Sequence, residues 1–145
     1  MLLSSTELFH VDTTLKCDGP SYLSKGRYLV RNHASSVTPN GIVSCGGRDH
    51  WNGNPHCQRL AQSGNWVAFP SMTSKRYHFG LKNMSDLLWA VGGVGGNRSM
   101  EYIDPRNPNK WSQETIPFRV WGHCLTDLSN NRLIVTGGDQ NGVSK

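Results

Sequence analysis

The chain has 145 residues, a formal net charge of +5, 16 glycines, 17% charged and 36% apolar residues. This length suits one ordinary domain, and no apolar run approaches the roughly 18 residues that a membrane-spanning helix requires. The basic residues are scattered, which disfavours nucleic acid as the partner. Abundant glycine without a long stretch of helical period favours short strands joined by tight turns.

Three apolar, β-favouring runs each end in a pair of glycines. They are IVSCGG, LWAVGG and LIVTGG, and their last glycines stand at 47, 93 and 138, which are 46 and 45 residues apart. Glycine lets a strand end sharply and lets its backbone pass close to a neighbouring sheet, because it lacks a Cβ and tolerates positive φ. We therefore expect structural roles for Gly46, Gly47, Gly92, Gly93, Gly137 and Gly138.

Tryptophan recurs with the same period. Trp66 and Trp111 each lie 26 residues before the first glycine of the next pair, and a proline follows each of them, Pro70 and Pro117. The large indole is predicted to fill the wedge between adjacent sheets. Self-similarity at a period near 45 residues is the sequence signature of a repeat architecture.

These features resemble Kelch repeats, each of which forms one four-stranded blade of a β-propeller. The strand SMEYIDP, ending at Asp104-Pro105, adds to the resemblance, whereas the first copy has KCDGPSYLSKGRY where a tryptophan is expected. The resemblance covers nearly the whole chain. It implies an all-β fold of about three antiparallel four-stranded blades in an incomplete ring, because propellers typically close with four to eight blades.

The predicted strands follow this pattern in chain order. Strands 6–12 and 15–19 belong to a leading half-blade (1–19), strands 28–37, 41–47, 56–61 and 65–70 to a first full blade (20–70), strands 77–84, 87–93, 99–104 and 111–117 to a second (71–117), and strands 121–128 and 132–138 to a trailing half-blade (118–145). Unpaired edges would remain on 6–12 and 132–138. We expect the rest of a longer chain, or a second copy, to supply the missing blades.

Two of the four cysteines are predicted to form a disulfide. Cys45 and Cys57 fall on neighbouring antiparallel strands joined by the loop 48–55, within disulfide reach. Buried free thiols are the alternative, and the spacing does not match the short C-x₂₋₄-C pairs of zinc sites. Cys17 and Cys124 have no assigned partner, because one falls on an outer strand and the other on an inner strand.

Several features favour an extracellular location, with the cytoplasm as the alternative. Asn83-Met84-Ser85 and Asn97-Arg98-Ser99 fit the N-glycosylation pattern, and both are predicted in loops. The positions of Cys17, Cys45 and Cys57 also resemble those in secreted invertebrate Kelch-repeat proteins. The cytoplasmic alternative is favoured by the first residues, MLLSSTELFH, because they lack the basic and apolar regions of a signal peptide.

No catalytic residue, metal or cofactor is predicted. His33, His78 and His123 fall on the inner strands, and galactose oxidases, which resemble Kelch propellers, hold copper with Tyr and His ligands near the propeller axis. The three histidines align as one repeat position, however, so we expect them to pack rather than to bind metal. The glycine run 92–97 lacks the helix that a nucleotide-binding loop needs. A copper-oxidase-like enzyme stays as an alternative.

A protein-binding surface is the predicted function. The loops 20–27, 48–55, 71–76, 94–98 and 118–120 emerge on one face of the disc, and loops on a rigid scaffold carry recognition. The basic residues there would suit an acidic peptide, a sulfated glycan or a phosphorylated segment. The substrate-recognition propeller of an intracellular ubiquitin-ligase adaptor is an alternative function. The predicted partner-binding residues are Arg48, Asp49, His50, Trp51, Lys75, Arg76, Arg98 and Arg119.

Overall fold

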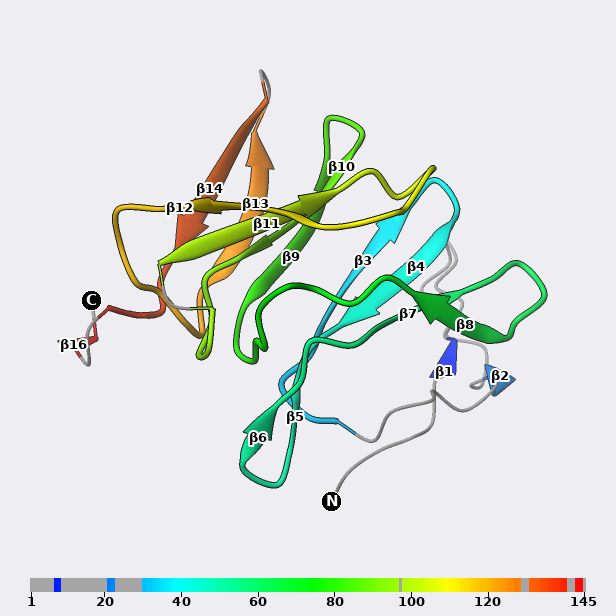
Figure 1. The fold of residues 1–145 in the computed structure, drawn as a ribbon, viewed down its shortest axis with the longest axis horizontal. Helices are drawn as coiled ribbons and strands as arrows, with labels where there is room; N and C mark the ends of the chain where they lie inside the picture. Colours follow the sequence, from blue (N-terminus) through cyan, green and yellow to red (C-terminus); the bar gives the residue numbers. More distant parts are fainter. Residues whose placement is uncertain are drawn as a thin grey trace, which may run out of the picture.

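The computed structural model describes residues 7–8, 21–22, 30–96, 98–128, 131–140 and 143–144. Every regular element in these ranges is a β-strand, which confirms the predicted all-β fold class (Figure 1). Within the same ranges, the structure has no helix of the length and apolar character that crossing a bilayer demands. The predicted strand 15–19 lies outside the described residues.

Two open, four-stranded antiparallel sheets make up most of the structure, in the order of a Kelch-type blade. The first sheet consists of β3 (Ala34–Thr38), β4 (Gly41–Cys45), β7 (Cys57–Leu60) and β8 (Trp66–Phe69), and a small hairpin of β5 (Arg48–Asp49) and β6 (Asn52–Gly53) projects between β4 and β7. The second sheet consists of β9 (Gly80–Met84), β10 (Leu87–Val91), β11 (Ser99–Ile103) and β12 (Ser112–Thr115).

Three further strand pairs complete the description. They are β13 (Cys124–Leu128) with β14 (Arg132–Thr136), β1 (Glu7–Leu8) with β2 (Ser21–Tyr22), and β15 (Asp139–Gln140) with β16 (Val143–Ser144). The predicted strands 28–37 and 77–84 begin later than expected, because Asn32 and His78 turn the chain with φ values of +60° and +55°.

The first strands of the three units lie next to one another, and the sheets fan outward from them (Figure 1). Strand β9 contacts β3 on one side and β13 on the other. The Asn83 backbone N–H donates to Ser36 Oγ at 3.0 Å, and Lys82 Nζ pairs with Asp127 Oδ1 at 2.6 Å. These contacts set neighbouring sheets side by side, as in a propeller.

The glycine pairs bring the end of one sheet against the chain that enters the next. The N–H of Gly47 donates to the carbonyl of Arg76 at 2.8 Å, and the N–H of Gly93 donates to the carbonyl of Val120 at 2.7 Å. A Cβ on Gly46 would stand 2.5 Å from the Arg76 carbonyl oxygen, and φ is +65° there. Any larger residue would therefore both clash and be strained.

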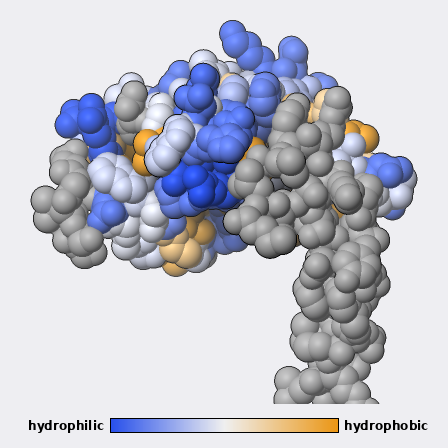
Figure 2. Space-filling model, turned by 90° about the horizontal axis from the view of Figure 1, so that it is seen from below, coloured by the Kyte–Doolittle hydropathy of each residue, from blue (hydrophilic) through white to orange (hydrophobic). Residues whose placement is uncertain are grey.

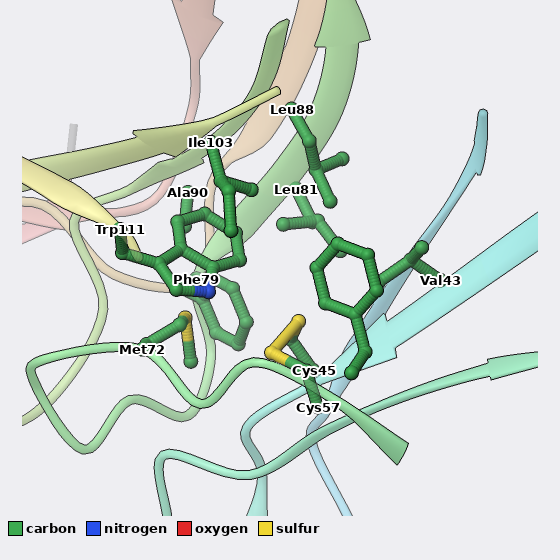
Figure 3. Close-up of a cluster of buried hydrophobic side chains, with 11 residues drawn as sticks. Val43, Cys45, Cys57, Met72, Phe79, Leu81, Leu88, Ala90, Ile103 and Trp111 are labelled. Carbon is green, nitrogen blue, oxygen red and sulfur yellow. A yellow bond between two sulfur atoms is a disulfide. The ribbon is translucent and has the colours of Figure 1, made fainter. Parts of the chain in front are cut away.

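The main hydrophobic core lies between the first and second sheets (Figure 3). Trp111 is 2% exposed in this core, and its indole N–H donates to the carbonyl of Pro70 at 2.8 Å, so it joins the two sheets. Trp66 is half-buried and stands outside this cluster. The core cluster consists of Val43, Cys45, Cys57, Phe69, Met72, Phe79, Leu81, Leu88, Ala90, Ile103 and Trp111.

A buried ion pair connects the loop before the second sheet to the middle of that sheet. Arg76 and Glu101 have fully buried side chains, and their Nη2 and Oε1 atoms are 2.9 Å apart. Arg76 also donates to the carbonyls of Gly92 and Ser99, at 2.7 and 2.9 Å. The Glu101 carboxylate accepts the backbone N–H groups of Thr73 and Ser74.

Arg76 was predicted to lie on the partner-binding face, and this prediction is wrong. Its guanidinium points inward because Glu101, the one carboxylate on the buried face of β11, supplies the charge that burial requires. In the first sheet the equivalent positions hold Val30 and Gln58, so that sheet has no counterpart of this ion pair.

The histidines of the inner strands do not share one repeat position. His33 and His123 directly precede β3 and β13, and Phe79 holds the equivalent place before β9. His78 stands one residue earlier, at the position of Asn32 and Gly122, where φ is positive in all three units. The predicted common position of the three histidines is therefore wrong for His78. In the segment RYHF the histidine comes one residue before the position that His33 and His123 occupy.

The imidazole of His123 is enclosed by glycine backbone. A Cβ on Gly80 would approach its Nε2 atom to 3.0 Å, and a Cβ on Gly92 would approach its Cε1 atom to 3.2 Å. Both ring nitrogens are buried without a hydrogen-bond partner among the described residues. This burial lowers the pKa of His123, since the charged form loses its hydration.

We predict that Glu101→Gln destabilises the protein by about 3 kcal/mol, because it leaves the buried Arg76 guanidinium without a countercharge. Chemical denaturation followed by circular dichroism measures the change. The double variant Arg76→Val with Glu101→Gln copies the first sheet and should recover part of the loss. A double variant no more stable than Glu101→Gln would contradict this account.

We predict that the free energy of unfolding falls as the pH drops from 7.5 to 5, partly through His123. Above its ordinary pKa of about 6.5 this histidine is neutral in both states, but below that value the unfolded chain binds a proton that the folded protein resists. His123→Phe, which copies Phe79, should make the pH slope shallower. Denaturant titrations at several pH values test this, and an unchanged slope would refute it.

Candidate binding face

The hairpin of β5 and β6 presents a tryptophan to solvent. Trp51 is 84% exposed at its tip and does not fold back as a loop anchor. The side chains of Asp49, His50 and Asn52 around it are exposed as well. A large flat side chain held in water in this way offers apolar area to a partner at low conformational cost.

Several contacts fix the base and the flank of this hairpin. The Cys45–Cys57 disulfide joins directly paired residues of β4 and β7, so it closes the segment that contains the hairpin. Two backbone hydrogen bonds of 3.1 and 2.9 Å bridge Arg31 and Arg48. The Arg31 guanidinium donates to the carbonyl of His50 at 3.1 Å. The hairpin that carries Trp51 is therefore held at its base and along its flank.

Arg48 is held by an aromatic ring of the next unit. Its guanidinium carbon lies 5.0 Å from the centre of the Tyr77 ring, within the range of a cation–π contact. Gly53 on β6 lies against the same ring, since a Cβ there would approach Tyr77 Cδ1 to 3.2 Å. Arg48 is thus half-buried, and its guanidinium packs against the next unit.

The remaining predicted binding residues are distributed over the same set of loops. Lys75 precedes Arg76 in the loop before β9, Arg98 stands in the turn before β11, and Arg119 lies in the loop before β13; all three are exposed. Figure 2 shows the molecule from the side on which these loops emerge, and hydrophilic side chains dominate the middle of that side. Lys25 and Arg27, in the predicted loop 20–27, lie outside the described residues.

Two residues that sequence reasoning missed belong to this face, Tyr77 and Trp121. Each forms an isolated bridge with the residue after a glycine pair, Tyr77 with Val94 and Trp121 with Asp139. Arg31 forms the equivalent bridge with Arg48. The available signal was their similar distance from the glycine pairs, since Arg31, Tyr77 and Trp121 stand 16, 16 and 17 residues before the last glycine of the following pair.

Near the inner strands, polar side chains meet without forming a metal-binding group. The Asn32 amide nitrogen lies 2.8 Å from His78 Nε2. Across the described ranges, no three His, Cys, Asp or Glu side chains gather as metal ligands would. Cys124 is a free, exposed thiol, and Cys17 lies outside the described residues.

The two glycosylation sequons differ in their setting. Asn83 belongs to strand β9 and is half-buried, so the predicted loop position is wrong for it. Its side-chain oxygen is enclosed without a hydrogen-bond partner among the described residues. The strand continues to Met84 because Asn83 pairs with Leu88 of β10. Asn97 lies outside the described residues.

Comparison with known proteins identifies relatives of one type. No family model matches the chain. It is 30% identical over 130 residues to Kelch-like protein 40a of Danio rerio, covering 79% of this chain and 21% of the relative. It is 30% identical over 119 residues to Kelch-like protein 41 of Rattus norvegicus, covering 73% and 19%. With Kelch-like protein 40 of Xenopus laevis the identity is 22% over 134 residues, covering 83% and 22%.

The chain spans about a fifth of the length of these curated relatives. They do not support the closer resemblance to secreted invertebrate proteins. They do agree with the repeated glycine pairs and with the blade-like order of both four-stranded sheets. The weak similarity and the fold together support Kelch repeats and a β-propeller architecture for this chain.

Proposed function

We propose that this chain is a non-catalytic interaction module that binds a carboxylate-rich protein segment through the loop face described above. The observation that carries the proposal is Trp51, exposed on a hairpin that a disulfide, a backbone bridge and an arginine all brace. Rigid support means that little conformational entropy is lost when a partner covers the indole.

The charges on this face favour an acidic partner. The acidic residues that accompany its basic side chains in the described loops are Asp49 and Asp139. Arginine forms forked, charge-assisted hydrogen bonds with carboxylates, so such a segment gains both affinity and orientation here. The basic residues in the described loops of this face are Arg31, Arg48, Lys75, Arg98 and Arg119.

An interaction role also agrees with the relatives. The Kelch-like similarity supports a protein-interaction domain, and protein partners follow from it. The absence of catalytic activity is part of the proposal, together with the absence of a cofactor. The histidines support it, because His33 and His78 stand at different repeat positions and His123 is enclosed by glycines.

A further part of the proposal concerns the third unit. Strand β14 pairs with β13 alone among the described strands, whereas its counterparts β4 and β10 pair on both sides. An open strand edge offers unpaired N–H and C=O groups to another strand. We propose that β14 receives a strand from the missing part of the propeller, supplied by a longer chain or by a second copy.

An extracellular or surface-exposed location completes the proposal. The Cys45–Cys57 disulfide supports it, because disulfides persist in oxidising compartments and are rare in the cytosol. The exposed basic face could then meet acidic proteins outside the cell. Glycosylation is proposed at Asn97, and Asn83 is a poorer acceptor because it belongs to a strand.

We predict that a glutamate-rich peptide binds the protein and that Trp51→Ala weakens this binding about tenfold, because the indole is the main apolar contact. Arg98→Ala should weaken binding less and reduce its dependence on salt. Isothermal titration calorimetry at two salt concentrations measures both effects. Arg106→Ala, in the turn between β11 and β12 on the other side of the molecule, is the control. Equal losses for Arg106→Ala and Trp51→Ala would refute the assignment of the face.

We predict that protein secreted from a eukaryotic host shows two titratable thiols, those of Cys17 and Cys124, when denatured without reductant. It should also carry a glycan that Asn97→Gln removes. A thiol assay and a gel-shift with glycosidase provide the readouts. Four free thiols and no glycan would overturn the extracellular location, although not the binding face itself.

A further inference from the structure

Two successive interfaces between units can be compared residue by residue on the loop face. In the first interface, Gly47 donates to the carbonyl of Arg76, and in the second, Gly93 donates in the same way to Val120. The residues that follow the glycine pairs therefore correspond, Arg48 with Val94. The residues that follow the accepting carbonyls correspond as well, Tyr77 with Trp121.

In the first interface the chain covers its own aromatic ring. The Arg48 guanidinium lies over Tyr77, with 5.0 Å from its carbon to the ring centre. The β5–β6 hairpin adds Gly53 against the edge of the same ring. This coverage needs a long side chain at position 48 and a long connection between β4 and β7.

The second interface lacks both of these features. Val94 replaces the arginine, and its side chain is too short to reach across the Trp121 ring. The connection is shorter too, because Gly92 donates to Ser99, seven residues on, whereas Gly46 donates to His56, ten residues on. A cavity of about 220 Å³ results, lined by Gly93, Val94, Gly95, Arg119 and Trp121.

We propose that this cavity is an anchor pocket for one aromatic side chain of the acidic partner segment. The first interface shows that a flat group fits over the equivalent ring, and offset stacking on an indole suits an aromatic ring. Arg119 is exposed at the cavity and has no ion pair among the described residues. It repels a second cation and attracts a carboxylate next to the ring.

The inference rests on the proposed function, because it assumes a carboxylate-rich segment on this face. The loop face should bind a segment with an aromatic residue between acidic ones more tightly than a segment with acidic residues alone. We also predict that the chain can be made to fill its own pocket. An arginine at position 94 would lie over Trp121 as Arg48 lies over Tyr77.

Two labelled heptapeptides serve as probes, Glu-Asp-Glu-Phe-Glu-Asp-Glu and the same peptide with alanine in place of phenylalanine. Fluorescence anisotropy at low salt should show that the phenylalanine peptide binds the full chain about tenfold more tightly. Val94→Arg should abolish this preference, although it adds a positive charge to a face that attracts acidic peptides. Val37→Arg adds the same charge on β3, at an exposed residue outside this face, and should keep the preference.

Arg119→Ala provides a second variant at an exposed position, where folding is not at risk. It should weaken the binding of both peptides and leave some preference for phenylalanine. Equal binding of the two peptides to the unmodified chain would overturn the pocket while leaving the acidic face in place. A preference that survives Val94→Arg would also overturn it. Binding of neither peptide would overturn the proposed acidic partner itself.

Discussion

The close backbone contact at each of the first two glycine pairs is the constraint on which the rest of the structure depends. The N–H groups of Gly47 and Gly93 reach carbonyls of the chain entering the next sheet, and only residues without a Cβ allow that approach at positive φ. These contacts fix the distance between neighbouring sheets. They also place Arg48 beside Tyr77 and Val94 beside Trp121, so the geometry of the loop face is a consequence of the packing.

A different cross-link stabilises each full sheet near its glycine pair. In the first sheet a disulfide crosses from β4 to β7, and in the second the Arg76–Glu101 ion pair spans from the entering loop to β11. Both lie in regions of low exposure, so each has a high cost if one partner is removed. The first sheet has no such ion pair, because the uncharged residues Val30 and Gln58 occupy the two equivalent positions.

The same repeated frame carries two different surfaces. Where Arg48 covers Tyr77, the face is closed and supports a projecting hairpin with Trp51. Where Val94 follows the glycine pair, a cavity lies beside Trp121, and Arg119 is one of its lining residues. In the proposed function, the projecting Trp51 and the cavity beside Trp121 belong to one recognition surface. The difference between them follows from arginine or valine after the glycine pair and from a three-residue difference in the length of the connection.

The sequence by itself predicted the all-β class and the positions of most strands in the two full sheets, because glycine spacing and alternation depend on local geometry. It left Cys45 and Cys57 as either a disulfide or buried free thiols, and the structure joins them in a disulfide. Only the tertiary structure decided which basic residues are available. Arg76 and Arg98 look alike in sequence, yet Glu101, 25 residues further along, draws Arg76 into the interior. The pocket beside Trp121 was likewise beyond sequence reasoning, since it exists only where side chains of two units meet, and a period reveals equivalent positions but not the space between them.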